Sequence, residues 1–282
     1  MSRFIKSHGL GNDYLVSDGA LALSPARVEA LCDRHEGIGG DGILEELPST
    51  RAAYGLRIWN PDGSLAEKSG NGLRIFARYL FDHRGAPPLF TVETAGGLVT
   101  CAIADDGSVE VEMGWPTFEP AEIPCARPLR LTPIALPDRT LALTAVGMGN
   151  PHCVAFFDEP LDALPWTQWG AQLTDHPLFP NRTNVQFARI LSDELVELRI
   201  FERGAGPTRA SGSSACAVVA VGQALGRLGP AVQAQMPGGL LHLRRGADGQ
   251  LIQRGPVVEV GVFCLSAAAV SALPPALSPT PT

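Results

Sequence analysis

The feature that most constrains the fold of this 282-residue chain is an internal repeat. At an offset of 142 residues, the segment 58–72 (IWNPDGSLAEKSGNG) aligns with the segment 200–214 (IFERGAGPTRASGSS). The same offset aligns two further pairs of dipeptides, Gly97-Leu98 with Gly239-Leu240 and Asp106-Gly107 with Asp248-Gly249, and an offset of 138 aligns GLGND (9–13) with GMGNP (147–151). Matches that keep their order along the chain predict two similar halves.

Each half is expected to contain the same elements in the same order. A first strand leads to a G-x-G-N turn, and a later strand ends at Asn60 or Glu202. A loop then leads to a helix headed by Ser69 or Ser211, nine residues after the strand end, and a hairpin with an Asp-Gly turn closes the half. The two serine-headed helices are apolar on most faces, so each must be surrounded by other elements.

These patterns predict an α+β fold with two pseudo-symmetric lobes. Each lobe is expected to be a mostly antiparallel sheet wrapped round a central helix, with the active site in the cleft between the lobes. The predicted N-terminal lobe spans residues 1–118 and gains a last strand near 260–266, and the C-terminal lobe spans 119–260. A Pro-rich stretch (118–138) joins the lobes, and the Pro/Ser/Thr-rich tail at 272–282 is expected to be disordered.

Composition excludes several classes of partner. The net charge is −7 and no basic run is present, which argues against nucleic acid. No apolar window approaches 18 residues, so no membrane span is expected. No phosphate-loop, dinucleotide, nucleophile-elbow or metal motif occurs, so neither a cofactor nor a metal is predicted. We also allow for a homodimer.

The cysteines point to the cytoplasm. The closest two of the six are 24 residues apart, so no C-x-x-C pair exists, and the N-terminus has no signal-peptide segment. We expect reduced core thiols in a cytoplasmic protein. The six are Cys32, Cys101, Cys125, Cys153, Cys216 and Cys264.

The two helix mouths combine a serine with glycine-rich sequence. Glycine lets a ligand approach the backbone, and a helix N-terminus favours an anion. The simpler interpretation is that Ser69 and Ser211 are N-caps, and the twofold repetition is what makes a functional role comparably strong. His152 alone would be a structural histidine, Glu202-Arg203 a solvated turn, and the Asn residues of Gly-rich turns ordinary turn chemistry.

Seven segments, in order, resemble the signature blocks of diaminopimelate epimerases. The resemblance runs from residue 6 to about 262, and the combination is far more specific than any one block. The blocks are HGLGNDYLV, LCDRHEGIGGDGIL, WNPDGSLAEKSGNGLRIFARYL, GMGNPHCV, RTNVQF, FERGAGPTRASGSSACA and MPGGLL. The resemblance implies two pseudo-symmetric α/β halves, an active site between them, and interconversion of LL- and meso-diaminopimelate without pyridoxal phosphate or metal, for lysine and peptidoglycan precursors.

The resemblance also implies roles for individual positions. Two cysteines of the family exchange a proton at opposite faces of the α-carbon, and they fall on Ser69 and Ser211. His152 and Glu202 match groups that assist the thiols. Helix-mouth donors for the carboxylate match Gly70, Asn71, Gly212 and Ser213. Other substrate-binding positions match Asn12, Asn60, Asn150, Asn184, Glu202 and Arg203.

Serine at both acid–base positions departs from the family pattern. A free thiol has a pKa of about 8.5 that a helix N-terminus can lower, whereas a serine hydroxyl is a far weaker acid. We therefore expect substrate binding with little turnover. Two explanations stay open: engineered replacement of both cysteines, or natural serines in a relative with another activity. The alternatives are a cofactor-independent racemase or isomerase of another amino acid, and a non-catalytic amino-acid-binding protein.

Overall fold

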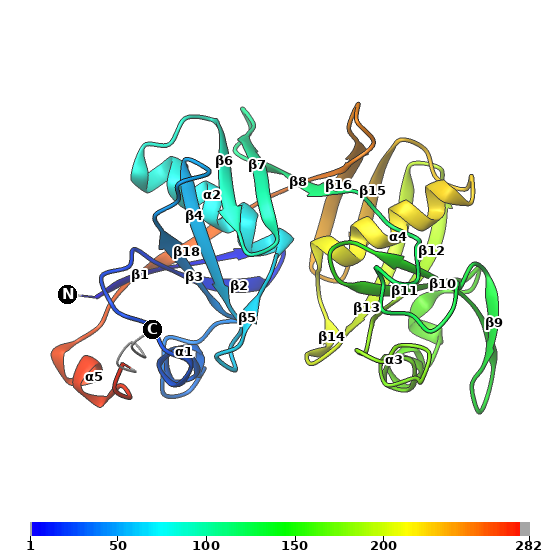
Figure 1. Ribbon diagram of the computed structural model, residues 1–282, viewed down its shortest axis with the longest axis horizontal. Helices are drawn as coiled ribbons and strands as arrows, with labels where there is room; N and C mark the ends of the chain where they lie inside the picture. Colours follow the sequence, from blue (N-terminus) through cyan, green and yellow to red (C-terminus); the bar gives the residue numbers. More distant parts are fainter. Residues whose placement is uncertain (1, 277–282) are drawn as a thin grey trace. The chain divides into compact units, whose positions relative to one another are not determined.

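The computed structural model describes residues 2–276 and divides the chain into two compact units (Figure 1). Unit 1 comprises Met1–Val111 and Pro256–Thr282, and unit 2 comprises Glu112–Gly255. The tail predicted at 272–282 begins at the last residue of helix α5 (Ala267–Ala272), and Arg27 Nε donates a hydrogen bond of 2.7 Å to the Pro274 carbonyl. Residues 277–282 of that tail lie outside the described residues.

Unit 1 is built from strands and a few helices. The strands are β1 (Arg3–Gly9), β2 (Asn12–Ser17), β3 (Ile43–Leu47), β4 (Tyr54–Trp59), β5 (Leu65–Ala66), β6 (Leu89–Thr94), β7 (Gly97–Ile103), β8 (Val109–Gly114, which continues into unit 2) and β18 (Val258–Cys264). The helices are α1 (Pro25–Cys32), α2 (Gly70–Arg84) and α5 (Ala267–Ala272).

Unit 2 has a corresponding set of elements. The strands are β9 (Thr132–Ala135), β10 (Thr140–Gly147), β11 (Pro151–Phe156), β12 (Asn184–Ser192), β13 (Leu195–Glu202), β14 (Gly206–Thr208), β15 (Ala231–Met236), β16 (Gly239–Arg245) and β17 (Leu251–Gly255). The helices are η1 (Leu161–Ala163), α3 (Trp166–Thr174) and α4 (Gly212–Ala224).

Strand pairing follows the same sequence in both units. In unit 1, β1 pairs antiparallel with β18 and β2, β2 pairs parallel with β3, and β4 pairs antiparallel with β3 and β5 but parallel with β6. In unit 2, β10 takes the place of β1, with antiparallel partners β9 and β11, and the parallel pairs are β11–β12 and β13–β15. The consecutive strands β6 and β7 pair antiparallel in unit 1, and β15 and β16 do so in unit 2. The predicted repeat and the mostly antiparallel α+β class are confirmed.

The turns that define the repeat use glycine for its backbone freedom. In the G-x-G-N turns after β1 and β10, Gly11 and Gly149 have φ values of 86° and 84°. This left-handed region is strained for residues with a Cβ atom. The Asp-Gly turns also form as predicted, because the β7–β8 and β16–β17 connections carry Gly107 and Gly249 with φ values of 79° and 88°.

One long helix is enclosed within each unit. In unit 1, α2 contacts β1, β2 and β7, and Leu73, Phe76 and Leu80 are fully buried. In unit 2, α4 contacts strands β10 to β12 and β15 to β17, and every residue from Ala215 to Val221 is fully buried. The two central helices are therefore apolar on most faces because strands of the same unit surround them, as predicted (Figure 1).

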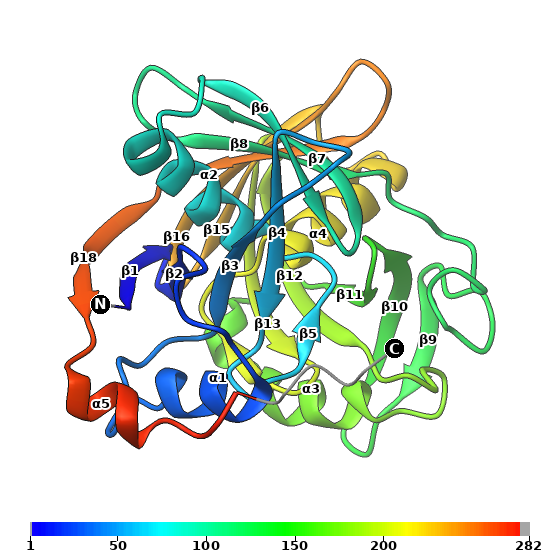
Figure 2. The same ribbon diagram turned by 60° about the vertical axis from the view of Figure 1, so that its left-hand side comes forward.

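Shorter helices cover a second apolar cluster in each unit. In unit 1, Val28 and Leu31 of α1 pack with Phe4, Leu15 and Ile43, and the segment around α5 adds Leu265 and Leu273. Figure 2 shows α5 beside α1, as these contacts require. In unit 2, α3 contributes Trp169, whose ring stacks on Phe157 at 5.9 Å. These clusters hold the strand ends that carry the candidate site residues.

Two details differ from the sequence-based expectation. The Pro-rich stretch 118–138 was expected to join two lobes, but it packs into unit 2, where it forms β9 and buries Ile123 and Leu129. The unit boundary accordingly lies at Val111/Glu112. None of the six cysteines forms a disulfide; five are buried, whereas Cys264 on β18 is exposed. The expectation of a core thiol was wrong for Cys264.

Candidate active site

In unit 1, Ser69 is the N-cap of the central helix α2. Its Oγ accepts a hydrogen bond of 3.0 Å from the Gly72 N–H, and its carbonyl accepts from Leu73 N–H at 2.8 Å. The buried Tyr14 hydroxyl lies 3.3 Å from Ser69 Oγ. The capping interpretation is therefore correct for Ser69, and the same oxygen lies at the positive end of the helix.

Three polar side chains next to this helix mouth form a connected series. Asn71 is buried, donates from Nδ2 to Asn12 Oδ1 at 3.1 Å, and accepts at Oδ1 from Arg74 Nη2 at 2.8 Å. Arg74 is fully buried on α2, and a Cβ atom at Gly9 would lie 2.8 Å from its Nη2 atom. The first glycine of the G-x-G-N turn thus makes room for a buried guanidinium.

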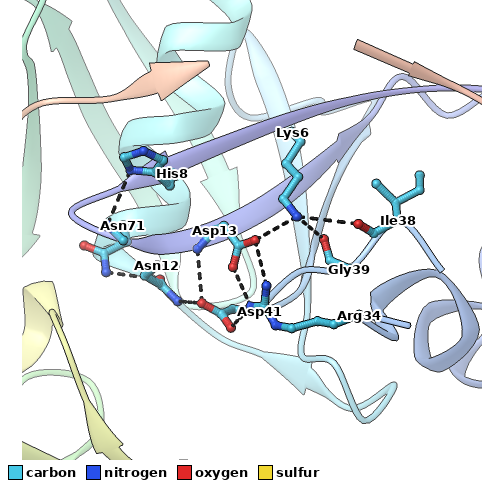
Figure 3. Close-up of polar contacts among 10 residues, drawn as sticks. Lys6, His8, Asn12, Asp13, Arg34, Ile38, Gly39, Asp41 and Asn71 are labelled. Carbon is cyan, nitrogen blue, oxygen red and sulfur yellow. Dashed lines mark hydrogen bonds and ion pairs between the residues drawn. The ribbon is translucent and has the colours of Figure 1, made fainter. Parts of the chain in front are cut away.

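Charged residues hold Asn12 from its other side (Figure 3). Asp41 Oδ2 accepts from Asn12 Nδ2 at 2.7 Å and from Asp13 N–H at 3.1 Å. Arg34 bridges the two carboxylates through contacts of 2.7 Å, and Lys6 Nζ lies 3.1 Å from Asp13. Both the nitrogen and the oxygen of the Asn12 amide therefore have defined partners, which fixes the orientation of the amide.

Asp13 is the acid at the centre of this network. Burial alone would raise the pKa of Asp13, but hydrogen bonds from Arg34 and Lys6 outweigh it, and the pKa lies below its ordinary value. Asp13 is thus a carboxylate at neutral pH. Lys6 also donates to the Gly39 carbonyl at 2.8 Å, which ties the network to the loop before β3.

Asn60 lies apart from this hydrogen-bonded network. Its backbone N–H and its Nδ2 both donate to Ser64, at 2.8 Å to the carbonyl and 3.0 Å to Oγ. The structure therefore joins Asn12 and Asn71 directly, while Asn60 is held within its own turn after β4.

In unit 2, Ser211 occupies the matching N-cap of α4 but differs in its contacts. Ser211 is buried and its side chain makes no cap hydrogen bond, so the first turn of α4 is started only by its carbonyl, which accepts from Ala215 N–H at 3.1 Å. A Cβ atom at Gly212 would come within 2.3 Å of Gln253 Oε1. Any larger residue at this position would have to displace the fully buried Gln253 side chain.

His152 lies on β11 and is connected to the first turn of α4 through Gln186, which contacts both His152 and Ser214. It is fully buried, and burial lowers the pKa of His152 to about 3, with the positive charge of Arg203 acting in the same direction. The imidazole is neutral at physiological pH. Its Nε2 lies 2.7 Å from Asn150 Oδ1, and its Nδ1 lies 3.0 Å from Gln186 Nε2.

The remaining predicted residues of unit 2 lie at the ends of β12 and β13. Asn184 Nδ2 donates to the Pro151 carbonyl at 3.1 Å, and Asn184 Oδ1 accepts from Arg203 N–H at 3.0 Å. The Arg203 guanidinium is exposed and donates to the Asn181 carbonyl, and Glu202 accepts from Thr208 Oγ1 at 3.1 Å. Asn184 thus connects the strand that carries His152 to the turn that carries Arg203.

Several residues with a clear place in these networks were absent from the sequence-based prediction. They are Tyr14, Asp41, Arg74, Gln186 and Ser214. In the sequence, Gln186 and Tyr14 stand in strand-like alternation, and Arg74 stands in an apolar helix, where a basic residue is ordinarily assigned to the surface. The GGDG segment could have drawn attention to Asp41, since it occurs in a block used for the family resemblance.

The described residues contain no group of three or more His, Cys, Asp or Glu side chains that could hold a metal ion. In the same part of the chain, no helix has the length and apolar character needed to cross a membrane.

Comparison with known proteins gives a consistent family. The family model described as "Diaminopimelate epimerase" matches residues 4–119 and 144–260. "Diaminopimelate epimerase 2" of Nostoc sp. is 46% identical over 246 residues, covering 84% of this chain and 86% of that protein. "Diaminopimelate epimerase" of Nitrosomonas eutropha is 40% identical over 269 residues, covering 92% of this chain and 96% of that protein.

Solved structures share the fold at low sequence identity. A probable proline racemase from Agrobacterium radiobacter K84 aligns with a TM-score of 0.71 and 17% identity, covering 95% of this chain and 93% of that one. A hydroxyproline epimerase from Agrobacterium vitis has the same TM-score and identity, covering 93% and 91%. From the extent of the family match and the identity to these relatives, the chain belongs to the diaminopimelate epimerase family of isomerases.

Proposed function

We propose that this chain is a diaminopimelate epimerase scaffold, acting in lysine and peptidoglycan precursor biosynthesis in the cytoplasm, in which serine stands at both acid–base positions. The observation that carries the proposal is the equivalence of Ser69 and Ser211. Each is the N-cap of the central helix of its unit, and each is followed by a glycine. The same position at both central helices fits a reaction that uses two proton-transfer groups.

The helix mouths supply the binding of the substrate carboxylate in this proposal. The first N–H groups of an α-helix have no partner within the helix, and the macrodipole adds a partial positive charge. Gly70 and Gly212 let an anion approach these groups closely. We assign Gly70, Asn71, Gly212 and Ser213 to the binding of the substrate carboxylate through these backbone donors.

The missing acidity is the reason we propose that turnover is slow. One proton-transfer group must be ionised while the other is a usable acid. A helix N-terminus contributes about 1 kcal/mol, which is less than one pKa unit, and the gap between a serine hydroxyl and a working acid is far larger. Neutral His152 is held on both nitrogens and is a poor candidate for a base that would activate Ser211.

The polar residues at the strand ends complete the proposed site. We assign substrate binding to Asn12, Asn60, Asn150, Asn184 and Arg203, and we assign Glu202 and His152 to the support of the acid–base groups. The networks around Asn12, Asn150 and Asn184 favour this assignment, since each amide makes at least one hydrogen bond within the chain and is thereby oriented before a ligand arrives.

The test is a conversion assay with LL-diaminopimelate, followed by chromatographic separation of the LL and meso forms. The unmodified chain is compared with Ser69→Cys, Ser211→Cys and the double variant. We expect measurable conversion only in the double variant. Conversion of a different amino acid, with none of diaminopimelate, would favour the alternative racemase. Calorimetric binding without conversion in any chain would favour an amino-acid-binding protein.

We also propose that the chain forms a homodimer through β18. Val258, Val260 and Val262 alternate along this strand and are 49%, 55% and 46% exposed. An exposed apolar strand is suited to antiparallel pairing with the same strand of a second copy, which gives a closed twofold assembly. Sedimentation velocity should give a dimer for the unmodified chain and a monomer for Val260→Lys. A monomeric unmodified chain would contradict this assignment.

A further inference from the structure

We infer that Gln186 is a positioning residue of the site, which fixes the tautomer of His152 and thereby aims the amide N–H groups of Asn150 at the ligand. The relevance to substrate binding rests on the proposed function, but the tautomer itself is independent of it. Gln186 is fully buried on β12, directly beside His152 of β11 in the parallel register that pairs His152 with Asn184 and Val154 with Gln186.

The network has defined donors and acceptors. Gln186 Nε2 lies 3.0 Å from His152 Nδ1 and 3.1 Å from Ser214 Oγ, so its two hydrogens are directed at two acceptors. With Nδ1 accepting, the neutral imidazole carries its hydrogen on Nε2. That hydrogen is donated to Asn150 Oδ1 across 2.7 Å. One glutamine therefore links β11, β12 and the first turn of α4.

The opposite assignment is disfavoured by the number of unsatisfied donors. In the arrangement above, Gln186 Oε1 is the atom that is buried without a hydrogen-bond partner among the described residues. If the Gln186 amide were rotated by 180°, its NH₂ group would occupy that position, and two buried donors would lack acceptors. Orphaned buried N–H groups are rarer and more costly than under-satisfied carbonyl oxygens.

The consequence appears at Asn150, whose side chain is only partly buried. Because Oδ1 is occupied by the His152 hydrogen, the NH₂ group of Asn150 is the end that remains for a ligand. Asn150 would then recognise an acceptor such as a carboxylate oxygen and disfavour an ammonium group. Asn12 in unit 1 is held differently, since Asp41 already accepts from its Nδ2 and Asn71 donates to its Oδ1.

The first measurement uses the unmodified full-length chain labelled with ¹⁵N-histidine. His152 is expected to show a protonated Nε2 and an unprotonated Nδ1, and to keep both signals from pH 5 to pH 8. The charged group that acts on it is Arg203, whose positive charge also opposes protonation. A protonated Nδ1 in the neutral ring, or titration near pH 6.5, would overturn the inference.

Variants test the role of Gln186 itself. Gln186→Glu replaces the donor with an acceptor, so we expect the hydrogen to move to Nδ1 and the affinity for diaminopimelate to fall about tenfold or more. Gln186→Met keeps the size without the donor, and a mixture of both tautomers is expected. Gln235→Glu, at an exposed position of β15, controls for the added charge.

The outcomes separate the two proposals. An unchanged Nε2–H tautomer in folded Gln186→Glu and Gln186→Met would overturn the positioning role. If the unmodified chain has the expected tautomer but does not bind diaminopimelate in a calorimetric titration, the proposed function fails while the tautomer assignment stands.

Discussion

The two helix mouths offer a matched pair of substitutions, because only one of the two N-cap serines makes a capping hydrogen bond with its side chain. Ser69 Oγ accepts from Gly72 N–H at 3.0 Å, whereas Ser211 makes no side-chain cap bond. Ser69→Ala removes the cap from α2, and Ser211→Ala removes a buried hydroxyl that stabilises no helix donor. We expect the first to lower the free energy of unfolding and the second to leave it nearly unchanged.

The magnitude follows from the capping bond. Loss of a serine cap costs typically about 1 kcal/mol, with a range of about 0.5–2. The Tyr14 hydroxyl, 3.3 Å from Ser69 Oγ, also loses a neighbour, which places the expected cost of Ser69→Ala in the upper half of that range. For Ser211→Ala we expect a change within about 0.5 kcal/mol of zero. In thermal unfolding, 1 kcal/mol corresponds to about 2–4 °C for a protein of this size.

The assay is equilibrium unfolding in urea, followed by far-UV circular dichroism, with thermal unfolding as a second readout. Ser69→Asp serves as the matched control, because aspartate caps helices as well as serine does and interacts favourably with the helix dipole. It should recover most of the stability that Ser69→Ala loses. Equal losses for Ser69→Ala and Ser211→Ala would refute the assignment of different roles to the two serines.

Three further predictions concern thiols, acid and packing. Iodoacetamide at pH 8 should label the exposed Cys264 quickly and leave Cys32 unlabelled in the folded chain, since burial raises the pKa of Cys32 to about 12. Rapid labelling of the folded Cys264→Ser variant would contradict the protection of the buried thiols. The pKa of Asp13 is lowered in the folded state, so its ionised form stabilises the fold at any pH above the ordinary pKa of 3.8, and this contribution is lost as the pH falls through the lower folded-state pKa. The stability deficit of Arg34→Met should therefore be complete at pH 7 and shrink below pH 4. A deficit that does not change with pH would be inconsistent with this prediction. Gly212→Ala should lower the free energy of unfolding in urea by about 1–3 kcal/mol, because the added methyl group clashes with Gln253. Gly229→Ala, whose added Cβ atom would lie 3.4 Å from its nearest neighbour, should lower it far less. Similar losses for the two variants would refute the packing argument.

The repeat made much of the fold predictable from the sequence. An offset shared by Ser69 and Ser211 identified both central helices, and the Asp-Gly dipeptides identified both closing hairpins. Composition predicted less well at the edges of the units. Prolines in 118–138 suggested a linker, but proline does not prevent burial, and the apolar residues between the prolines pack into unit 2. Cys264 was predicted to be buried because cysteine usually is, but it is exposed in the structure.

The candidate site was predictable only where residue type and position together carry information. Asn12, Asn71 and His152 were predicted as site residues from the glycine-rich turns and the family blocks. Gln186 was missed because its partner His152 is 34 positions away and becomes a neighbour only through parallel pairing of β11 with β12. Arg74 was missed because the sequence does not reveal that an arginine on an apolar helix is fully buried. Tertiary pairing, which local patterns do not encode, determines both.

The measurement that tests the central claim most directly is exchange of the α-proton of diaminopimelate in deuterated water, followed by mass spectrometry. The unmodified chain and the Ser69→Cys/Ser211→Cys variant are compared at equal concentration. We predict deuterium incorporation by the double-cysteine variant and little or none by the unmodified chain, because a serine hydroxyl at a helix N-terminus is too weak an acid for the step. Absence of exchange in the folded double variant would contradict the epimerase assignment, and rapid exchange by the unmodified chain would contradict the argument from acidity.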